Sequence, residues 1–392
     1  MGEGLTSSAK ASFVDNWIYL QQALGYASRR IKDIMKTYKT SQNFFSSPYE
    51  EWKDSGIFTK RDLLKLKNFD TDKIEKIKIH CKQKGYKIIT YESPDYPNRL
   101  RNIYNPPAVL YVNGTFPKVD NELCIAIVGT RSATRYGLGT SFEFGYKLAK
   151  FGTTVVSGGA LGIDSSAQKG AIMAGGKVIS VMGCGLDCHY LEKNNNLKKA
   201  ISLTGAIVSE YEPGYTVIAR NFPVRNRIIS ALSLGTLIVE AGRKSGSLIT
   251  ANLALEQNRD LFAVPGDIKS SMSIGTNSLI KECAKPVTCV EDILEEYYSK
   301  FPNLNTTQAD KESKTEGKIE PIEKMSKREN KNLKVSSRAR NIYNFLKNTE
   351  FMTIDELILK AKMSTADALQ GITELELNGL VENKPGRMYK KK

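Results

Sequence analysis

The sequence predicts an α/β protein built on a doubly wound, mostly parallel sheet, with a small helical domain before it and a winged-helix domain after it. Three observations support this fold class. Short apolar runs alternate with helical patterns between residues 121 and 290, as in successive βαβ units. Amphipathic helical patterns precede this stretch, and three helical patterns with a strand pair follow it. The length of 392 residues suits two or three domains.

Residues 1–95 carry the first helical patterns, in which apolar residues recur at helical spacing. We interpret them as a helical domain of the SAM or helix-hairpin-helix kind. Helices are expected at 17–24, 29–38, 58–66 and 71–84. Pro106-Pro107 then opens an extended run, because the residue before a proline disfavours the helical conformation.

Residues 96–300 form the predicted central domain. Its strand candidates are short, continuously apolar and rich in β-branched residues, which is typical of a parallel sheet covered on both faces. Strands are expected at 123–128, 153–157, 178–182, 206–209, 236–239 and 261–264, and helices at 137–150, 164–174, 225–233 and 248–257.

Residues 301–335 contain hardly any large apolar side chains, which predicts a flexible linker. Residues 336–392 then return to an ordered pattern. Helices are expected at 338–346, 354–361 and 365–377, followed by two strands around Lys384-Pro385-Gly386-Arg387. This arrangement predicts a winged-helix domain.

Lysine and arginine number 57 against 42 aspartate and glutamate, a net charge of +15. This excess favours a polyanionic partner. Residues 1–120 alone carry 20 basic and 13 acidic side chains. No apolar run reaches ~18 residues, so we expect no membrane span. The six sparse cysteines are typical of reduced thiols, which predicts a cytoplasmic protein.

Two turns of the central domain, each directly after a predicted strand, are suited to binding phosphate. Gly129-Thr130-Arg131 follows the first strand, where backbone N–H groups and a guanidinium can hold an anion. Ser157-Gly158-Gly159 follows the second strand, and Asp164 is the expected N-cap of the next helix. The alternative for the first turn is a tight βα connection with a solvated arginine.

Two later segments carry further candidates. Phe222, Arg225, Asn226 and Arg227 combine an aromatic ring with cations and an amide, as in single-strand binding sites. The alternative is a capped helix with one core phenylalanine. Lys244-Ser245-Gly246-Ser247 adds a cation and hydroxyl groups. All four segments follow strand carboxyl ends, where doubly wound sheets place their ligand crevice, and together they predict a phosphate-lined cleft.

Catalytic and metal sites are not predicted. The spacing of Cys184, Cys188 and His189 matches no standard zinc site, so we expect core or loop thiols. The only other histidine is His80, and no carboxylate pair or Ser-His-Asp order is evident. We therefore expect no catalytic residue, no metal and no cofactor.

Taken together, these motifs resemble the DNA processing protein A family, also called DprA or Smf. The resemblance runs, in the family's order, through Tyr96-Pro97, Pro106–Tyr111, Ala126–Arg131, Ser157–Asp164, Gly185–Asp187, Ser209–Tyr211, Phe222–Ile229, Gly246–Thr250, Val264–Gly266 and Gly275–Asn277. It implies an extended Rossmann-like domain that binds single-stranded DNA and loads the RecA recombinase on it, protecting DNA taken up in natural transformation. It also implies a homodimer formed through the central domain, with single-strand-binding protein as a further candidate partner.

The resemblance also assigns residues. Arg131 matches the arginine of the family's G-S-R turn, Ser157-Gly158-Gly159 its S-G-G loop, and Arg225-Asn226-Arg227 its F-P-x-R-N-R segment. The family's Tyr-Pro after G-L-D is replaced here by Tyr190-Leu191. A DNA contact from Lys193 depends on the conformation of this loop.

Two alternatives are open. The related phosphoribohydrolases of the Lonely-guy type use a glutamate whose position falls on Thr250, and a hydroxyl cannot replace that acid–base group. The other alternative is a winged-helix regulator that binds duplex DNA. Its recognition helix would be 365–377, which carries Asp367, Glu374 and Glu376 but no lysine or arginine. The absence of basic residues on that helix therefore favours contact with a protein, or contact between the wing and the DNA backbone.

Overall fold

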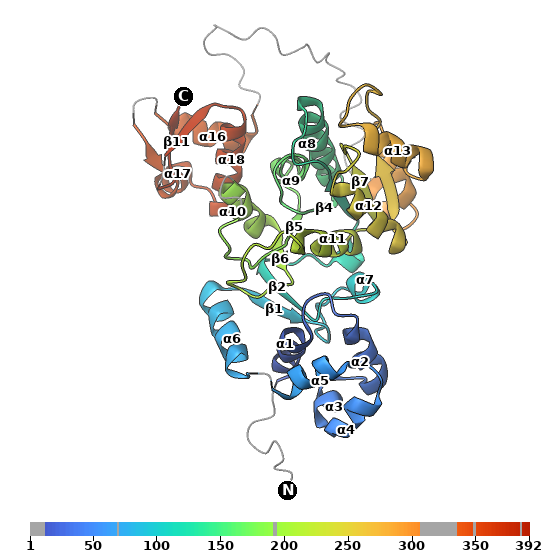
Figure 1. The fold of residues 1–392 in the computed structure, drawn as a ribbon. Helices are drawn as coiled ribbons and strands as arrows, with labels where there is room; N and C mark the ends of the chain where they lie inside the picture. Colours follow the sequence, from blue (N-terminus) through green and yellow to red (C-terminus); the bar gives the residue numbers. More distant parts are fainter. Residues whose placement is uncertain (1–11, 69, 191–193, 306–334, 348–349, 385) are drawn as a thin grey trace.

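The computed structural model describes residues 12–68, 70–190, 194–305, 335–347, 350–384 and 386–392. Its elements begin with a group of helices at the bottom of Figure 1. These are α1 (Phe13–Leu24), α2 (Arg30–Tyr38), α3 (Ser41–Ser46), α4 (Tyr49–Asp54), α5 (Lys60–Lys67) and α6 (Asp72–Lys84). They enclose Trp17 and Phe44, which are fully buried. The short helices α3 and α4 were not among the predicted ranges.

A nine-stranded sheet forms the centre, in the order β1-β2-β6-β5-β4-β3-β7-β8-β9. The strands are β1 (Lys87–Thr90), β2 (Val109–Gly114), β3 (Cys124–Val128), β4 (Thr154–Ser157), β5 (Val178–Met182), β6 (Ala206–Ser209), β7 (Gly235–Ile238), β8 (Asp260–Ala263) and β9 (Lys285–Pro286). The β1–β2 and β2–β6 pairs are antiparallel, and the other pairs are parallel. The predicted fold class is thereby confirmed.

The two faces of this sheet are covered differently. One face packs on α8 (Arg135–Lys150), α9 (Ile163–Met173), α10 (Asn195–Thr204) and α14 (Glu291–Leu294). The other packs on α11 (Asn221–Leu232), α12 (Ser247–Glu256) and the N-terminal helices. Remaining short elements are α7 (Asn98–Arg101), α13 (Ile274–Glu282), η1 (Val119–Asn121), η3 (Glu295–Tyr297) and η4 (Pro302–Asn305). Strand β1 lies inside the segment that the sequence assigns to the helical domain.

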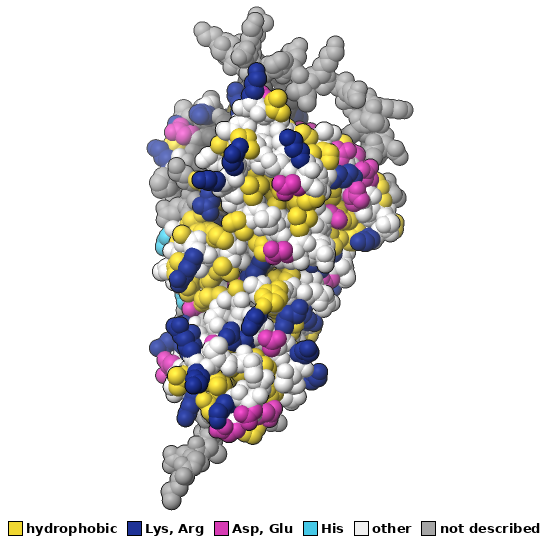
Figure 2. Space-filling view, turned by 45° about the vertical axis from the view of Figure 1, so that its right-hand side comes forward, with side chains coloured by type: hydrophobic (Ala, Val, Ile, Leu, Met, Phe, Trp, Pro, Cys, Tyr) yellow, Lys and Arg dark blue, Asp and Glu magenta, His cyan; other side chains and the backbone are white. Residues whose placement is uncertain are grey.

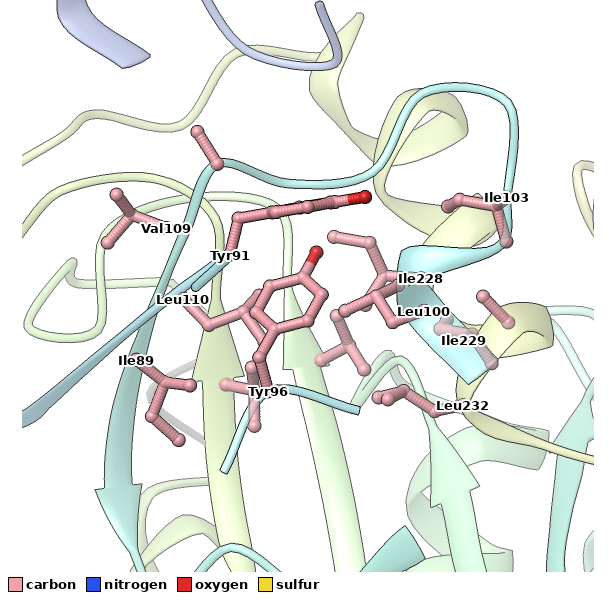
Figure 3. Close-up of a cluster of buried hydrophobic side chains, with 14 of the residues drawn as sticks. Ile89, Tyr91, Tyr96, Leu100, Ile103, Val109, Leu110, Ile228, Ile229 and Leu232 are labelled. Carbon is pink, nitrogen blue, oxygen red and sulfur yellow. The ribbon is translucent and has the colours of Figure 1, made fainter. Parts of the chain in front are cut away.

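Aromatic side chains pack over the antiparallel edge of the sheet. Figure 3 shows Tyr91 and Tyr96 beside Leu100 of α7 and against the apolar face of α11, which Ile228 and Leu232 represent. The Tyr96 hydroxyl donates to the carbonyl of Pro107 at 2.7 Å, so this buried polar group is satisfied. These contacts pack the segment between β1 and β2 against α11.

The C-terminal residues form a winged helix with its own core. It contains α16 (Ser337–Phe345), α17 (Ile354–Ala361), α18 (Thr365–Leu377), β10 (Met352–Thr353), β11 (Val381–Lys384) and β12 (Met388–Lys391). Helix α18 packs against α10 of the central domain (Figure 1). Across the described part of the chain, no helix combines the length and the apolar character needed to span a membrane.

Candidate nucleic-acid interface

A crevice opens where the strand order reverses. From β3 the chain adds β4, β5 and β6 on one side and then β7, β8 and β9 on the other, so β3 and β7 flank the switch point. Doubly wound sheets bind ligands at this place, beyond the carboxyl ends of the strands. The crevice has a volume of about 570 Å³. Of the predicted site residues, it is lined by Gly129, Thr130, Arg131, Phe222, Arg225, Asn226, Lys244, Ser245, Gly246 and Ser247.

The turn after β3 forms one wall. Gly129 is needed because a Cβ there would lie 2.5 Å from the side chain of Ile163. The Thr130 N–H donates to the carbonyl of Glu240 at 2.8 Å, which fixes the turn against the end of β7. Arg131 is exposed, and its guanidinium lies 5.1 Å from the centroid of the Phe222 ring. The turn therefore presents a cation that is already oriented.

The S-G-G loop lies beneath the crevice and does not line it. The Ser157 hydroxyl donates to the carbonyl of Ile127 at 2.7 Å, and the Gly158 N–H donates to Asp164 at 3.1 Å. Gly159 has φ +65, a conformation that favours glycine. Asp164 lies in the first turn of α9, whose N-cap is Gly162, so the predicted N-cap was wrong. The carboxylate closes this loop instead.

Arg225 supports the same loop from α11. It is 4 % exposed and donates to the carbonyls of Gly158, at 2.8 Å, and Val181. Burial lowers the pKa of Arg225, and the nearby Asp164 carboxylate opposes that shift. Burial likewise raises the pKa of Asp164, and Arg225 opposes it. The donors of Arg225 are thus largely committed to the protein.

Arg227 points to the opposite side of α11. It is 2 % exposed and forms a buried ion pair with Glu210 at 2.8 Å. Residues two apart on a helix face nearly opposite directions, whereas residues 222, 225 and 226 share a face at i, i+3 and i+4 spacing. The structure therefore brings Phe222, Arg225 and Asn226 together in the crevice and places Arg227 elsewhere.

The loop before α12 forms the opposite wall. Lys244 is exposed, and the hydroxyls of Ser245 and Ser247 lie 2.8 Å apart. Gly246 is the N-cap of α12, and a Cβ there would meet open space. Neither Arg131 nor Lys244 has an acidic partner among the described residues, so both cations face the crevice uncompensated. The predicted contact from Lys193 lies outside the described residues.

Sequence reasoning missed several lining residues, namely Val128, Ala160, Ala219, Ile249 and Met272. Val128, Ala160 and Ile249 lie within the motifs but are small or apolar, so they were not chosen as contacts. Ala219 and Met272 lie outside every motif, and Met272 comes from the loop after β8. The described residues contain no group of three or more metal-ligating side chains of the kind that Cys184 and His189 would begin. Burial raises the pKa of the Cys184 thiol to about 12, which disfavours a thiolate ligand.

Comparison with known proteins identifies the family. Residues 87–298 match the family model described as DNA recombination-mediator protein A, and residues 328–387 match the DprA winged helix domain. The chain belongs to the DNA recombination-mediator protein A family. The resemblance to DprA and Smf seen in the sequence is thereby confirmed, and the chain is related to DNA processing proteins.

The proteins similar to this chain include members of the DprA family. The DNA processing protein DprA of Streptococcus pneumoniae is 41% identical over 207 residues, 52% of this chain and 71% of that protein. Its crystal structure aligns with a TM-score of 0.63 at 31% identity, covering 72% of this chain and 97% of that one. DNA processing protein A from Helicobacter pylori, studied for its single-stranded DNA binding mode, aligns with a TM-score of 0.50 at 33% identity, covering 55% and 96%.

Proposed function

We propose that this chain binds single-stranded DNA in the switch-point crevice and acts as a recombination mediator that protects the strand and loads RecA on it. One observation carries the proposal. The exposed Arg131 guanidinium, oriented over Phe222, lines the same crevice of about 570 Å³ as Lys244 and the serine-rich turn. An uncompensated pair of cations beside two serine hydroxyls suits phosphodiesters. The single-strand binding of the Helicobacter pylori relative supports the same ligand.

The predicted site residues take different roles in this proposal. Arg131 and Lys244 contact phosphates, together with the Ser245 and Ser247 hydroxyls. The Gly129-Thr130 backbone holds its turn against Glu240. Arg225 positions the S-G-G loop, since its donors are held by carbonyls. Arg227 secures α11 through Glu210.

Phe222 acts mainly by orienting Arg131. Its ring lies 5.1 Å from the Arg131 guanidinium and 5.0 Å from the Tyr190 ring centroid, so neighbouring groups already occupy its surroundings. A cation held over an aromatic ring gains about 0.5–2 kcal/mol and keeps a defined direction. Phe222 therefore preorganises the phosphate contact.

The crevice favours binding over hydrolysis. Thr250, at the position of the Lonely-guy glutamate, is 1 % exposed. The carboxylate that lines the crevice, Asp164, closes the S-G-G loop and lies beside Arg225. We therefore assign no catalytic residue. The family role also implies RecA, a second copy of the chain and single-strand-binding protein as partners, and a cytoplasmic location.

The test is a titration of labelled single-stranded and duplex DNA across a range of salt concentrations. We expect single strands to bind more tightly and log affinity to fall with log salt by ~0.7 per neutralised phosphate. Arg131→Ala should weaken binding of all sequences about tenfold and reduce that slope by ~0.7. RecA filament formation on coated single strands should then slow in proportion.

Arg243→Ala is the matched control. Arg243 is exposed and lies beside Lys244 in sequence, but it does not line the crevice. An equal loss in both variants would show that only general charge attracts DNA. Preference for duplex DNA would favour the winged-helix regulator, and release of base from a nucleoside monophosphate would favour the hydrolase.

A further inference from the structure

A second cavity lies on the other side of the first turn of α11. Its volume is about 730 Å³, and Pro223 lines both this cavity and the crevice. Its walls come from the loop after α1, from α7 and the segment that follows it, and from the end of α12. The cavity therefore lies at the junction of the N-terminal helices with the central domain, directly across a shared wall from the proposed DNA site.

Two arginines stand inside this cavity with little acidic compensation. Arg99 has a side chain 10 % exposed, and its Nε lies 3.9 Å from Asp120. That carboxylate already accepts the backbone N–H groups of Asn98 and Arg99, at 2.7 and 3.1 Å. Arg259 donates to the carbonyls of Arg99 and Ala231, at 3.3 and 3.2 Å.

The charges of these two arginines disfavour one another. Burial lowers the pKa of Arg259, and the charge of Arg99 lowers it further. The acidic side chains that line the same cavity are Asp120, already engaged, and Glu256, which is exposed. An anionic group placed between the arginines would offset their repulsion. The cavity therefore favours a phosphate.

The N-terminal domain adds cations and an aromatic ring at the rim. Arg29 donates to the Tyr104 hydroxyl at 3.1 Å, and Lys32 donates to the carbonyl of Asn102 at 3.2 Å. Tyr104 itself is 70 % exposed, so its ring is accessible to a base. Exposed aromatic rings interleaved with cations are the chemistry that binds single strands, through base stacking and phosphate contacts.

We propose that the DNA strand held in the crevice crosses Pro223 and continues along a junction groove. This groove consists of Arg99, Tyr104 and Arg259 in the cavity and of Arg29 and Lys32 at its rim. The proposal rests on the proposed function and extends it. Phosphates lie against the arginines and Lys32, and a base stacks on Tyr104. Figure 2 shows basic side chains spread over the N-terminal part of this face. The junction groove thus gives the positive charge of residues 1–120 a specific role.

The test compares oligothymidylates of increasing length, from about 4 to about 20 nucleotides, because only longer strands can reach beyond the crevice. Arg29→Ala/Lys32→Ala should leave the shortest oligonucleotides unaffected. It should weaken the longest about tenfold and reduce their salt slope by ~1.4, for two lost phosphate contacts. The full-length protein is used throughout.

Lys82→Ala/Lys84→Ala is the matched control, because it removes the same charge from exposed positions of the same domain. Helix α6 lies on the other side of that domain from α2 and α7 (Figure 1). If both double variants behave alike at every length, the junction groove is overturned while the crevice stands. If the unaltered protein binds no single strand, the proposed function itself fails.

Fluorescence can test directly whether a base stacks at position 104. The chain has two tryptophans, Trp17 and Trp52, and both are buried. Tyr104→Trp therefore adds an exposed reporter over a background that DNA should not quench. Long oligonucleotides should quench it and the shortest should not. Quenching that is absent at saturating long DNA, or equal at all lengths, would overturn stacking at Tyr104.

Discussion

The N-terminal helices share a hydrophobic core with one face of the sheet, whereas the winged-helix domain encloses a core of its own. Trp17 and Leu20 belong to the same buried cluster as Val109 and Leu110 of β2. The winged-helix core, which includes Leu357 of α17, contains no residue of the sheet. Burial of apolar surface stabilises a fold roughly in proportion to its area. The N-terminal helices are therefore part of the central folding unit.

Polar contacts show the same difference. The buried Gln21 side chain donates to the carbonyls of Val109 and Glu210, at 3.2 and 3.1 Å, so an N-terminal helix completes the hydrogen bonding of β2 and the end of β6. In contrast, the winged helix brings charges of both signs to the central domain. Arg387 adds to the lowering of the Lys199 pKa by burial, whereas Glu376 opposes the lowering of the Lys169 pKa by burial. The first contact is made of paired hydrogen bonds, and the second joins charged side chains.

Deletion of whole domains should show the largest difference. Removal of residues 1–86 exposes the buried side chains of β2 and leaves Glu210 without its N-terminal donors. We expect the melting temperature of the remaining fold to fall by about 10 °C or more. Removal of residues 306–392 should leave that transition nearly unchanged. Calorimetry measures both, and equal effects would contradict the comparison.

The next effect concerns the ion pair between Glu210 and Arg227. Glu210→Ala leaves the Arg227 guanidinium buried and unpaired, which should cost about 3–5 kcal/mol of unfolding free energy. It also removes the acceptor of the Ala27 N–H, at 2.9 Å. Urea denaturation measures the loss. Glu382→Ala, in the exposed pair with Lys390 of the winged helix, is the control and should change nothing measurable.

A double-mutant cycle sharpens this test. Arg227→Met combined with Glu210→Ala should recover much of the stability, because no unpaired charge then remains. If the double variant is as unstable as the sum of the single variants, the ion pair is not what links α11 to the end of β6.

Continuous apolar strands were the easiest elements to predict. Val178–Met182 and Ala206–Ser209 were placed at their observed bounds because both faces of such strands are covered. Strand β1 was missed because it does not begin as a continuous apolar run. Lys87 is exposed and Ile88 is half-buried, and both come directly after α6. Its pairing with β2 depends on distant residues, so a local pattern could not indicate it.

The crevice was predictable for a topological reason. Residues after parallel strands meet at one edge, so Gly129, Arg131 and Lys244 could be grouped before any coordinates. Arg227 shows where this reasoning stops. It was grouped with Phe222 as a DNA contact, but its side chain pairs with Glu210, which lies beyond any local pattern. The junction groove depends on a contact between Arg29 and Tyr104, 75 residues apart, which no local pattern predicts.

The smallest expected effect is the pH dependence of the unfolding free energy that comes from helix capping boxes. Both flanking domains contain such a box. Asp62 closes the box of α5 with Thr59 and pairs with Arg30 at 2.7 Å. Burial raises the pKa of Asp62, but the Thr59 hydrogen bonds and Arg30 outweigh it, so the net pKa is lowered. A carboxyl group whose pKa is lowered on folding stabilises the fold at pH values above its ordinary pKa. This stabilisation is lost as the pH falls through the folded-state pKa.

Asp62→Asn should therefore cost about 1 kcal/mol at pH 7 and less near pH 3, where the unaltered protein has begun to lose the same contribution. Because α5 belongs to the shared core, the loss should appear in the unfolding of the central domain. Glu356→Gln, in the matching box of α17 with Thr353, should shift only the winged-helix transition. Urea titrations at the two pH values separate the cases. A central-domain shift caused by Glu356→Gln would mean that the winged helix is coupled to the sheet as closely as the N-terminal helices are.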